Sequence, residues 1–172
     1  MAVWEELLTA GHECDITPYG LEALMLLRAE KGFILVGEDT DGTQSPQDMG
    51  MNWMLSKNKN DFIGKRSLTL KDHIRTGREQ FVGLMTIQPG QVLNIGTPLV
   101  EKFSKTPPMT LIGHVTASYF SPALGRSITL ALAKDGQSRI GERIDLVDQG
   151  GAVEAQIVSP RFFDPEGRRS NS

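Results

Sequence analysis

The second half of the sequence consists of short apolar runs that are separated by turns containing glycine and proline. Each run is about the length of a typical β-strand and shorter than an ordinary helix. The runs cover residues 81–87, 99–103, 111–118, 127–133, 143–147 and 153–158. Several short strands with frequent turns predict an all-β barrel or sandwich for this half of the chain.

The first half of the sequence has helical rather than alternating periodicity. Apolar side chains in residues 2–10 recur at helical spacing, and Gly11 follows as a stop signal. Thr17 and Pro18 predict the start of a second helix, and Gly32 predicts its end. A third helix is expected within 62–72.

The segments that follow the second predicted helix are read from composition. The wholly apolar run 33–36 predicts a short strand or extended segment, and the polar residues 38–46 predict a surface loop. Residues 75–79 are interpreted as a linker, and Trp53 as a core residue. One or two strands are too few for a self-sufficient layered domain, so this α/β-like part is predicted to be incomplete.

Composition narrows the function classes. The net charge is −3, the pI is about 5.6 and the basic residues are scattered, which argues against a nucleic-acid-binding protein. No apolar run approaches the ~20 residues of a membrane span. The single cysteine excludes an internal disulfide, and the acidic N-terminal stretch is unlike a signal peptide. We therefore expect a cytoplasmic location and no membrane partner.

Most cofactor motifs are missing from the sequence. No Gly-x-Gly-x-x-Gly pattern and no phosphate-binding loop is present, so no flavin or NAD site is expected within this chain. The cluster of His12, Glu13 and Cys14 has no second cluster to complete a metal site, and Cys14 is expected to be a small buried residue. Residues 39–42 are expected to form an acidic turn, because Gly37 occupies a position where a calcium loop needs an acidic ligand. No metal site is predicted.

Arg28 is the strongest single candidate for a functional residue, because it lies between two segments that should be buried. It could be a cation at a helix C-terminus that complements the helix dipole, or a partner for Glu30. Alternatively, its planar guanidinium could face a cavity and bind an anionic or polar ligand. The residues alone leave both interpretations open.

Ordered motifs along the whole chain resemble the glycine-cleavage T-protein (aminomethyltransferase) family. The matching segments are 27–33, 37–39, 45–46, 50–53 and 61–68, followed by 113–118, 121–124 and the residues up to 131 in the family's C-terminal barrel. Within the family, the chain is most similar to the C-terminal end of the sarcosine oxidase alpha subunit. The segments that carry this similarity are 16–20, 28–33, 39–42, 121–127 and 163–167.

The resemblance implies an α+β fold. Residues 1–76 would form a partial α/β folate-binding subdomain that lacks the N-terminal part of the family fold, and 77–172 would form a small antiparallel β-barrel. It also implies tetrahydrofolate as ligand and one-carbon (aminomethyl or methylene) transfer as function. The folate-binding residues implied by the resemblance are Arg28, Glu30, Tyr119 and Arg126; catalytic residues are not identified.

The resemblance also implies a partner. The family's acidic residues at the pterin ring lie in the part that this sequence does not match, and such transfer needs positioned acid–base groups. We therefore expect the chain to be inactive alone and to need a protein partner or homo-oligomer that completes the missing subdomain. The alternative is a non-catalytic interaction or scaffold domain derived from the same fold.

Overall fold

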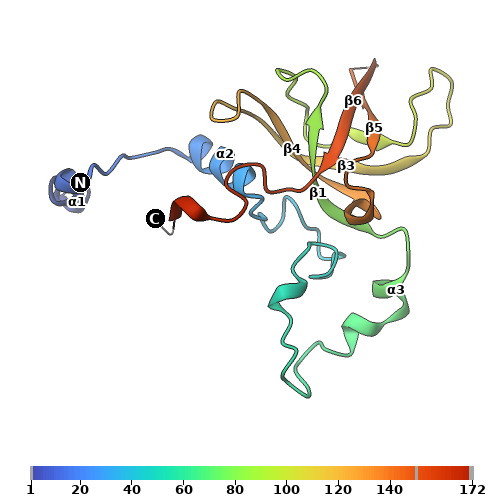
Figure 1. Cartoon of the computed structure of the whole chain (residues 1–172), viewed down its shortest axis with the longest axis horizontal. Helices are drawn as coiled ribbons and strands as arrows, with labels where there is room; N and C mark the ends of the chain where they lie inside the picture. The colour runs from blue at the N-terminus through green and yellow to red at the C-terminus, as the bar shows by residue number, and fades with distance from the viewer. Residues whose placement is uncertain (1, 150, 171–172) are drawn as a thin grey trace.

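A closed antiparallel β-barrel dominates the fold (Figure 1). The computed structural model describes residues 2–149 and 151–170. Within these residues the strands are β1 (Glu79–Thr86), β2 (Pro98–Val100), β3 (Leu111–Ser121), β4 (Arg126–Lys134), β5 (Arg143–Asp148) and β6 (Gly151–Val158). Their order around the barrel is β1-β4-β3-β2-β5-β6, so the first strand pairs with the last. The predicted α+β class with a small antiparallel barrel is confirmed.

The interior of the barrel is apolar, because its strands carry apolar residues where they face it. In β6, the buried residues Val153, Ala155 and Ile157 alternate with exposed ones, as expected of a strand with one face on the core. Strand β4 is buried on both faces: Ala131 and Ala133 belong to the interior cluster, whereas the outer-face residues pack with α2. The continuous apolar run of β4 therefore reflects a strand covered on both sides.

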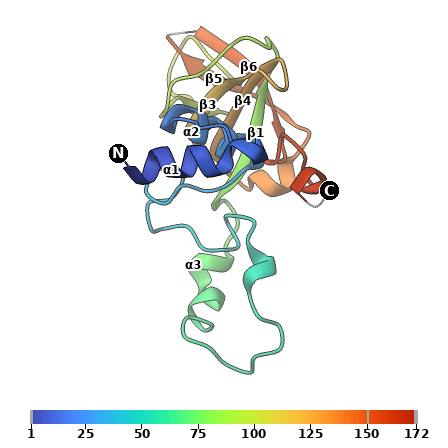
Figure 2. The ribbon, with the colours of Figure 1, turned by 90° about the vertical axis from the view of Figure 1, so that its left-hand side faces the viewer.

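The N-terminal region contains short helices joined by irregular segments. The α-helices are α1 (Ala2–Gly11), α2 (Leu21–Lys31) and α3 (Lys71–Ile74), and the 3₁₀ turns of this region are His12–Cys14, Asn52–Met54 and Ser67–Thr69. Two further 3₁₀ turns, Gly136–Arg139 and Arg168–Ser170, lie in the second half of the chain. Figure 1 shows α1 apart from the barrel, and Figures 1 and 2 both show α3 beyond one end of it. Helix α2 packs against the barrel, on β3 and β4. No helix in the described part of the chain is long and apolar enough to span a membrane.

Of the three predicted helices, one is confirmed, one begins later than predicted and one is wrong. The first helix is confirmed as α1, but α2 begins at Leu21 rather than near Thr17, because Gly20 is extended (φ −89°, ψ 177°) and acts as its N-cap. Gly32 ends α2 as predicted, since its N–H donates to the carbonyl groups of Ala29 and Arg28. The helix expected within 62–72 is wrong: an extended Leu70 separates a 3₁₀ turn from α3.

The predictions for 33–46 were only partly correct. Residues 33–36 form no strand, and their one bridge joins Val36 to Thr40. The predicted surface loop 38–46 is wrong at Asp39 and Ser45, which are buried because both take part in hydrogen bonds inside the structure. The single cysteine, expected to be buried, is exposed, because the surrounding 3₁₀ turn packs against nothing that covers it.

Helix α2 buries charged side chains and exposes apolar ones, which is the reverse of an ordinary surface helix. It buries Arg28, Ala29 and Glu30, while Leu21 and Leu24 are exposed to solvent. An amphipathic helix usually places its apolar stripe on the core and its charges outside. The last turn of α2 therefore brings two charged side chains against the barrel, and this junction is the part of the fold on which the candidate site is built.

Candidate functional site

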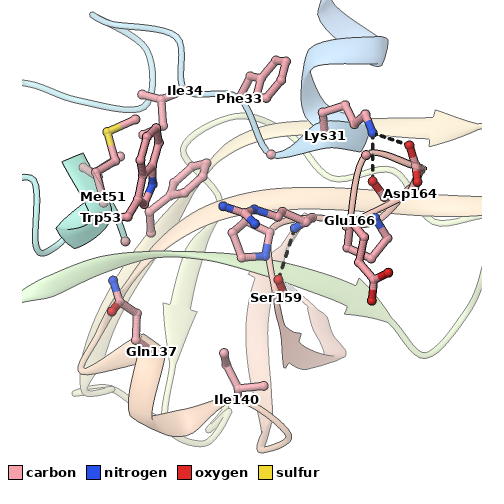
Figure 3. A pocket seen from close by; sticks show the side chains of 18 residues that line it. Lys31, Phe33, Ile34, Met51, Trp53, Gln137, Ile140, Ser159, Asp164 and Glu166 are labelled. Carbon is pink, nitrogen blue, oxygen red and sulfur yellow. Dashed lines mark hydrogen bonds and ion pairs between the residues drawn. The ribbon is translucent and has the colours of Figure 1, made fainter. Parts of the chain in front are cut away.

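A cavity lies where three segments meet beside the barrel (Figure 3). Its volume is about 710 Å³, and its lining comes mainly from 31–34 at the end of α2, from 49–53 and from the C-terminal segment 159–167. Figure 3 shows Trp53 and Met51 on one side and Asp164 and Glu166 on the other. Trp53, predicted to be a core residue, is 72% exposed, because it forms an open wall of this cavity.

The C-terminal segment is held against the end of α2 by backbone and side-chain contacts. The N–H groups of Phe162 and Phe163 both donate to the Glu30 carbonyl at 2.9 Å. Lys31 Nζ donates to the carbonyl of Asp164 at 2.8 Å and to its carboxylate at 2.9 Å. The hydrogen bond from Lys31 lowers the pKa of Asp164 below its ordinary value. The cavity wall at this point is therefore fixed by α2 itself.

Gly32 allows the C-terminal segment to approach closely. Its φ of +67° lies in the left-handed region that favours glycine. A Cβ atom at this position would lie 2.4 Å from the carbonyl oxygen of Pro160. Any other residue would push this segment away from α2.

Arg28 is buried beside the cavity but does not line it. Its Nη1 donates to the Phe33 carbonyl at 3.2 Å and to a carboxylate oxygen of Asp39. Its Nη2 lies 3.5 Å from the carboxylate of Glu38, which is half exposed. Its Nε is buried and has no hydrogen-bond partner among the described residues. One edge of the guanidinium is therefore fixed, and the other edge is only loosely occupied.

Glu30 and Arg126 lie near the same end of the barrel. The Ser121 hydroxyl at the end of β3 donates to the buried Glu30 carboxylate. Ser121 pairs in register with Arg126 at the start of β4. Arg126 Nη2 donates to the Thr86 carbonyl at 2.8 Å, and its Nε is buried without a partner in the described chain. The β3–β4 turn thus brings together two of the residues that the resemblance implied.

The residues implied by the resemblance are grouped at the α2–barrel junction, not in the cavity. Tyr119 on β3 is partly buried against the apolar cluster between α2 and the barrel. None of Arg28, Glu30, Tyr119 and Arg126 is among the described residues that line the cavity. Their assignment to folate stays a prediction, and the structure offers a second place, the cavity, that the sequence did not indicate.

A second buried ion pair, between Asp48 and Arg78, was missed at the sequence level. Arg78 Nε lies 3.0 Å from both carboxylate oxygens of Asp48, and Nη2 lies 2.7 Å from one of them. Residues 75–79 were interpreted as a linker, but Arg78 is buried. Burial raises the pKa of Asp48, yet hydrogen bonds from Arg78 and Ser45 outweigh it and hold that pKa below its ordinary value.

The cavity offers a flat apolar wall and charges of both signs, because Asp164 and Glu166 line it as well as two cations. Phe33, Ile34 and Trp53 give the cavity an apolar and aromatic wall, while Lys31 and Arg161 place cations at its rim. Such pockets usually combine apolar walls with a few polar groups that fix orientation. No group of three or more histidine, cysteine, aspartate or glutamate side chains in the described ranges could hold a metal ion.

Two family models match most of the chain. Residues 1–59 match the GCVT N-terminal domain, and residues 79–164 match the glycine cleavage T-protein C-terminal barrel domain. The second match covers the barrel and the start of the C-terminal segment. The resemblance found in the sequence is therefore confirmed.

Curated relatives and a solved structure agree with the family models. Sarcosine oxidase subunit alpha of Corynebacterium sp. (strain P-1) is 47% identical over 98% of this chain, and the aminomethyltransferase of Thermotoga neapolitana is 30% identical over 97%. The chain spans only 18% and 43% of these relatives. The aminomethyltransferase T of Bartonella henselae shares the fold, with a TM-score of 0.78 and 24% identity over 95% of this chain and 44% of its own.

Proposed function

This chain belongs to the glycine-cleavage T-protein (aminomethyltransferase) family, and on that premise we propose that it is a tetrahydrofolate-linked one-carbon transfer module. The likeness to sarcosine oxidase subunit alpha supports a role like that of the C-terminal part of that protein. In this role the chain would help bind the folate that accepts an aminomethyl or methylene unit.

The observation that carries the proposal is the buried, half-occupied guanidinium of Arg28. A buried cation is costly unless its donors are paired, so an unpartnered Nε at such a site calls for an acceptor. Tetrahydrofolate offers carbonyl and carboxylate oxygens that fit the planar donor edge of an arginine. Glu30, Tyr119 and Arg126 are proposed to contact the same ligand from the adjoining barrel end.

The site is proposed to be completed by a further part of the family fold. The chain spans less than half of the aminomethyltransferases that it matches. Leu21 and Leu24 on α2, with Trp4 and Leu7 on α1, are exposed in the first 76 residues. We propose that a neighbouring part of the fold covers these exposed apolar side chains. We assign this surface to the remainder of the α/β subdomain, on the same polypeptide or on a partner, and residues 77–172 to a separate barrel domain.

The test is isothermal titration of the chain with tetrahydrofolate, beside an Arg28→Lys variant. Lysine keeps the charge for Asp39 but lacks the planar fork, so binding should weaken by about tenfold or more. Arg143→Lys is the matched control, because this exposed arginine on β5 should tolerate the change. A Trp53→Ala variant tests the cavity. If this variant loses binding and the Arg28→Lys variant keeps it, the folate site must be assigned to the cavity instead.

The same titration decides between transfer module and scaffold. If neither the chain alone nor the chain joined to the remaining family segment binds tetrahydrofolate, the one-carbon proposal is rejected. The non-catalytic interaction domain would then be the better description. Binding only in the joined form would support the half-site interpretation, and one-carbon transfer should be assayed in that form.

A further inference from the structure

We propose that Asp39 is a positioning residue for Arg28, which holds the guanidinium so that its Nε and Nη2 edge is presented to an acidic or carbonyl group of the ligand. This inference rests on the proposed function, because it concerns the same arginine. It adds a residue whose role neither the motifs nor the family matches assign. It also predicts a competing role for the neighbouring Glu38.

Asp39 has no contact with solvent and joins three separate segments. Its exposed fraction is 0%. One carboxylate oxygen accepts from Arg28 Nη1 on α2 and from the Leu35 N–H at 2.8 Å. The other accepts from the Thr116 hydroxyl on β3. Both oxygens of the carboxylate are therefore committed, and Asp39 cannot rotate without breaking several hydrogen bonds at once.

A β-bulge in β3 places Thr116 where Asp39 needs a donor. The pairing of β3 with β4 shifts between Val115 and Ala117, so Thr116 has no partner across the strand pair. Bulges of this kind re-aim one side chain and often lie next to functional sites. Here the side chain that leaves the regular register is the one that donates to Asp39. The barrel thus contributes directly to the orientation of Arg28.

The contacts of Arg28 are distributed unevenly over its two edges. Nη1 donates to both Asp39 and the Phe33 carbonyl, whereas Nε has no partner in the described chain. A purely structural arginine would be expected to use all its buried donors, because each unmet one costs free energy. The Nε and Nη2 edge is also the side from which a carboxylate is bound by two parallel hydrogen bonds. We infer that this edge is kept for a ligand.

Glu38 occupies the free edge only weakly. Its carboxylate lies 3.5 Å from Nη2, and its side chain is half exposed, in contrast to that of Asp39. Exposed ion pairs of this length contribute little, and they are readily exchanged. An acidic ligand would displace Glu38 from Arg28, whereas Asp39 would stay in place. Glu38 therefore acts against ligand binding, and Asp39 acts for it.

The first experiment measures the position of Arg28 without any folate. The chain is treated with phenylglyoxal, which modifies arginine, and the modification at Arg28 is followed by mass spectrometry. Asp39→Asn keeps the shape but removes the charge, so Arg28 should become several-fold more reactive, while the exposed Arg143 should not change. Unchanged reactivity of Arg28 in a folded Asp39→Asn protein would overturn the inference, whatever the chain binds.

The second experiment is titration with tetrahydrofolate, in the form of the protein that binds it. Asp39→Asn should weaken tetrahydrofolate binding by about 10- to 100-fold, as is typical when a residue that orients a ligand-binding group is lost. Glu38→Gln should strengthen binding, because it removes the competing charge. Weaker binding by Glu38→Gln would contradict the inference that the ligand displaces Glu38 from Arg28. No binding by the unaltered protein, either alone or joined to the remaining family segment, would reject the proposed function, and the phenylglyoxal result would then decide the role of Asp39.

Thr116 supplies variants that do not disturb the charge pair. Thr116→Val removes the hydroxyl that donates to Asp39 at nearly the same volume, and Thr116→Ser keeps it. We expect the valine variant to raise Arg28 reactivity and to weaken tetrahydrofolate binding, and the serine variant to restore both. If Asp39→Asn fails to fold, this pair decides: equal behaviour of the valine and serine variants would refute the positioning role.

Discussion

The barrel and the N-terminal region bury opposite kinds of side chains. The barrel interior is filled by aliphatic side chains such as Leu84, Leu99 and Leu146, all fully buried. The N-terminal region buries charged residues, among them Arg28, Asp39 and Asp48, and leaves most of its large apolar side chains in solvent. A closed sheet has no free edge and needs no neighbour. The N-terminal region, in contrast, is anchored by ion pairs and exposes apolar side chains, which we propose are covered by another part of the family fold.

The comparison predicts the largest loss of stability where a buried charge is left without its partner. Asp48→Ala removes the buried carboxylate that pairs with Arg78 between the N-terminal loop and β1, which should cost roughly 3–5 kcal/mol in the free energy of unfolding. Asp72→Ala is the control, because Asp72 also pairs with Arg78 but is exposed, and it should cost less than about 1 kcal/mol. Urea unfolding measures both. Equal effects would remove the distinction between buried and surface pairing.

A cavity in the barrel should cost slightly less. Leu99→Ala on β2 removes a fully buried side chain from the interior cluster, and we expect a loss of about 3 kcal/mol in the free energy of unfolding. Leu99→Met nearly keeps the volume, and should cost under about 1.5 kcal/mol. A barrel that tolerated the alanine variant would not be the independently stable half of the molecule.

Acid should destabilise the chain by weakening the buried ion pair between Asp48 and Arg78. Because the pKa of Asp48 is lower in the folded chain than its ordinary value of 3.8, the pair with Arg78 stabilises the fold above about that pH. This stabilisation is lost as the pH falls from 3.8 through the folded pKa. Asp48→Asn should flatten this part of the stability curve, measured as urea midpoints at successive pH values. An unchanged slope would show that other carboxylates control acid unfolding.

The smallest effect on stability is expected on the exposed face of α2. Leu21 is 75% exposed, so Leu21→Ser should change the free energy of unfolding by less than about 0.5 kcal/mol. The same change should reduce binding of a hydrophobic dye, and it should weaken association with the remaining family segment. A large loss of stability would mean that α2 packs more fully than the proposed docking surface requires.

The domain division near residue 77 remains a prediction that proteolysis can test. Brief digestion should cut the irregular segment between Leu55 and Ser67 before it cuts any barrel strand, because cleavage favours exposed loops of low local stability. The barrel fragment should keep its cooperative unfolding. Cleavage within β1 or β6 first would argue against a separate barrel.

Local patterns in the sequence predicted the barrel strands well. Alternating or continuous apolar residues determine a strand directly, so 81–87, 127–133 and 153–158 correspond to β1, β4 and β6. The run 99–103 was too long, because the chain leaves the ladder after Val100. The start of α2 was misplaced, because Thr17 and Pro18 satisfy a helix-start pattern that the extended backbone at Gly20 overrides.

The candidate site depends on partners that are distant in sequence. The loop around Asp39 has an ordinary polar composition, and its burial depends on Thr116, 77 positions away. The pair of Asp48 and Arg78 spans 30 positions. No local pattern records such pairings. A carboxylate within three residues of an apolar run, as at Asp39 after 33–36, is nevertheless a signal of a buried charge. An arginine directly before a strand, as at Arg78, is another.

The pairing of β1 with β6 has a consequence for the order of folding. Barrel closure joins Gly83 to Val158, and the end of α2 gains two further hydrogen bonds when Phe162 and Phe163 donate to Glu30. These contacts connect residues that are far apart in sequence, which slows folding through the entropy of closing long loops. During synthesis, α2 leaves the ribosome before β6 and residues 162–163, so it cannot make these contacts until they have followed. Its exposed leucines are thus accessible before the barrel has formed.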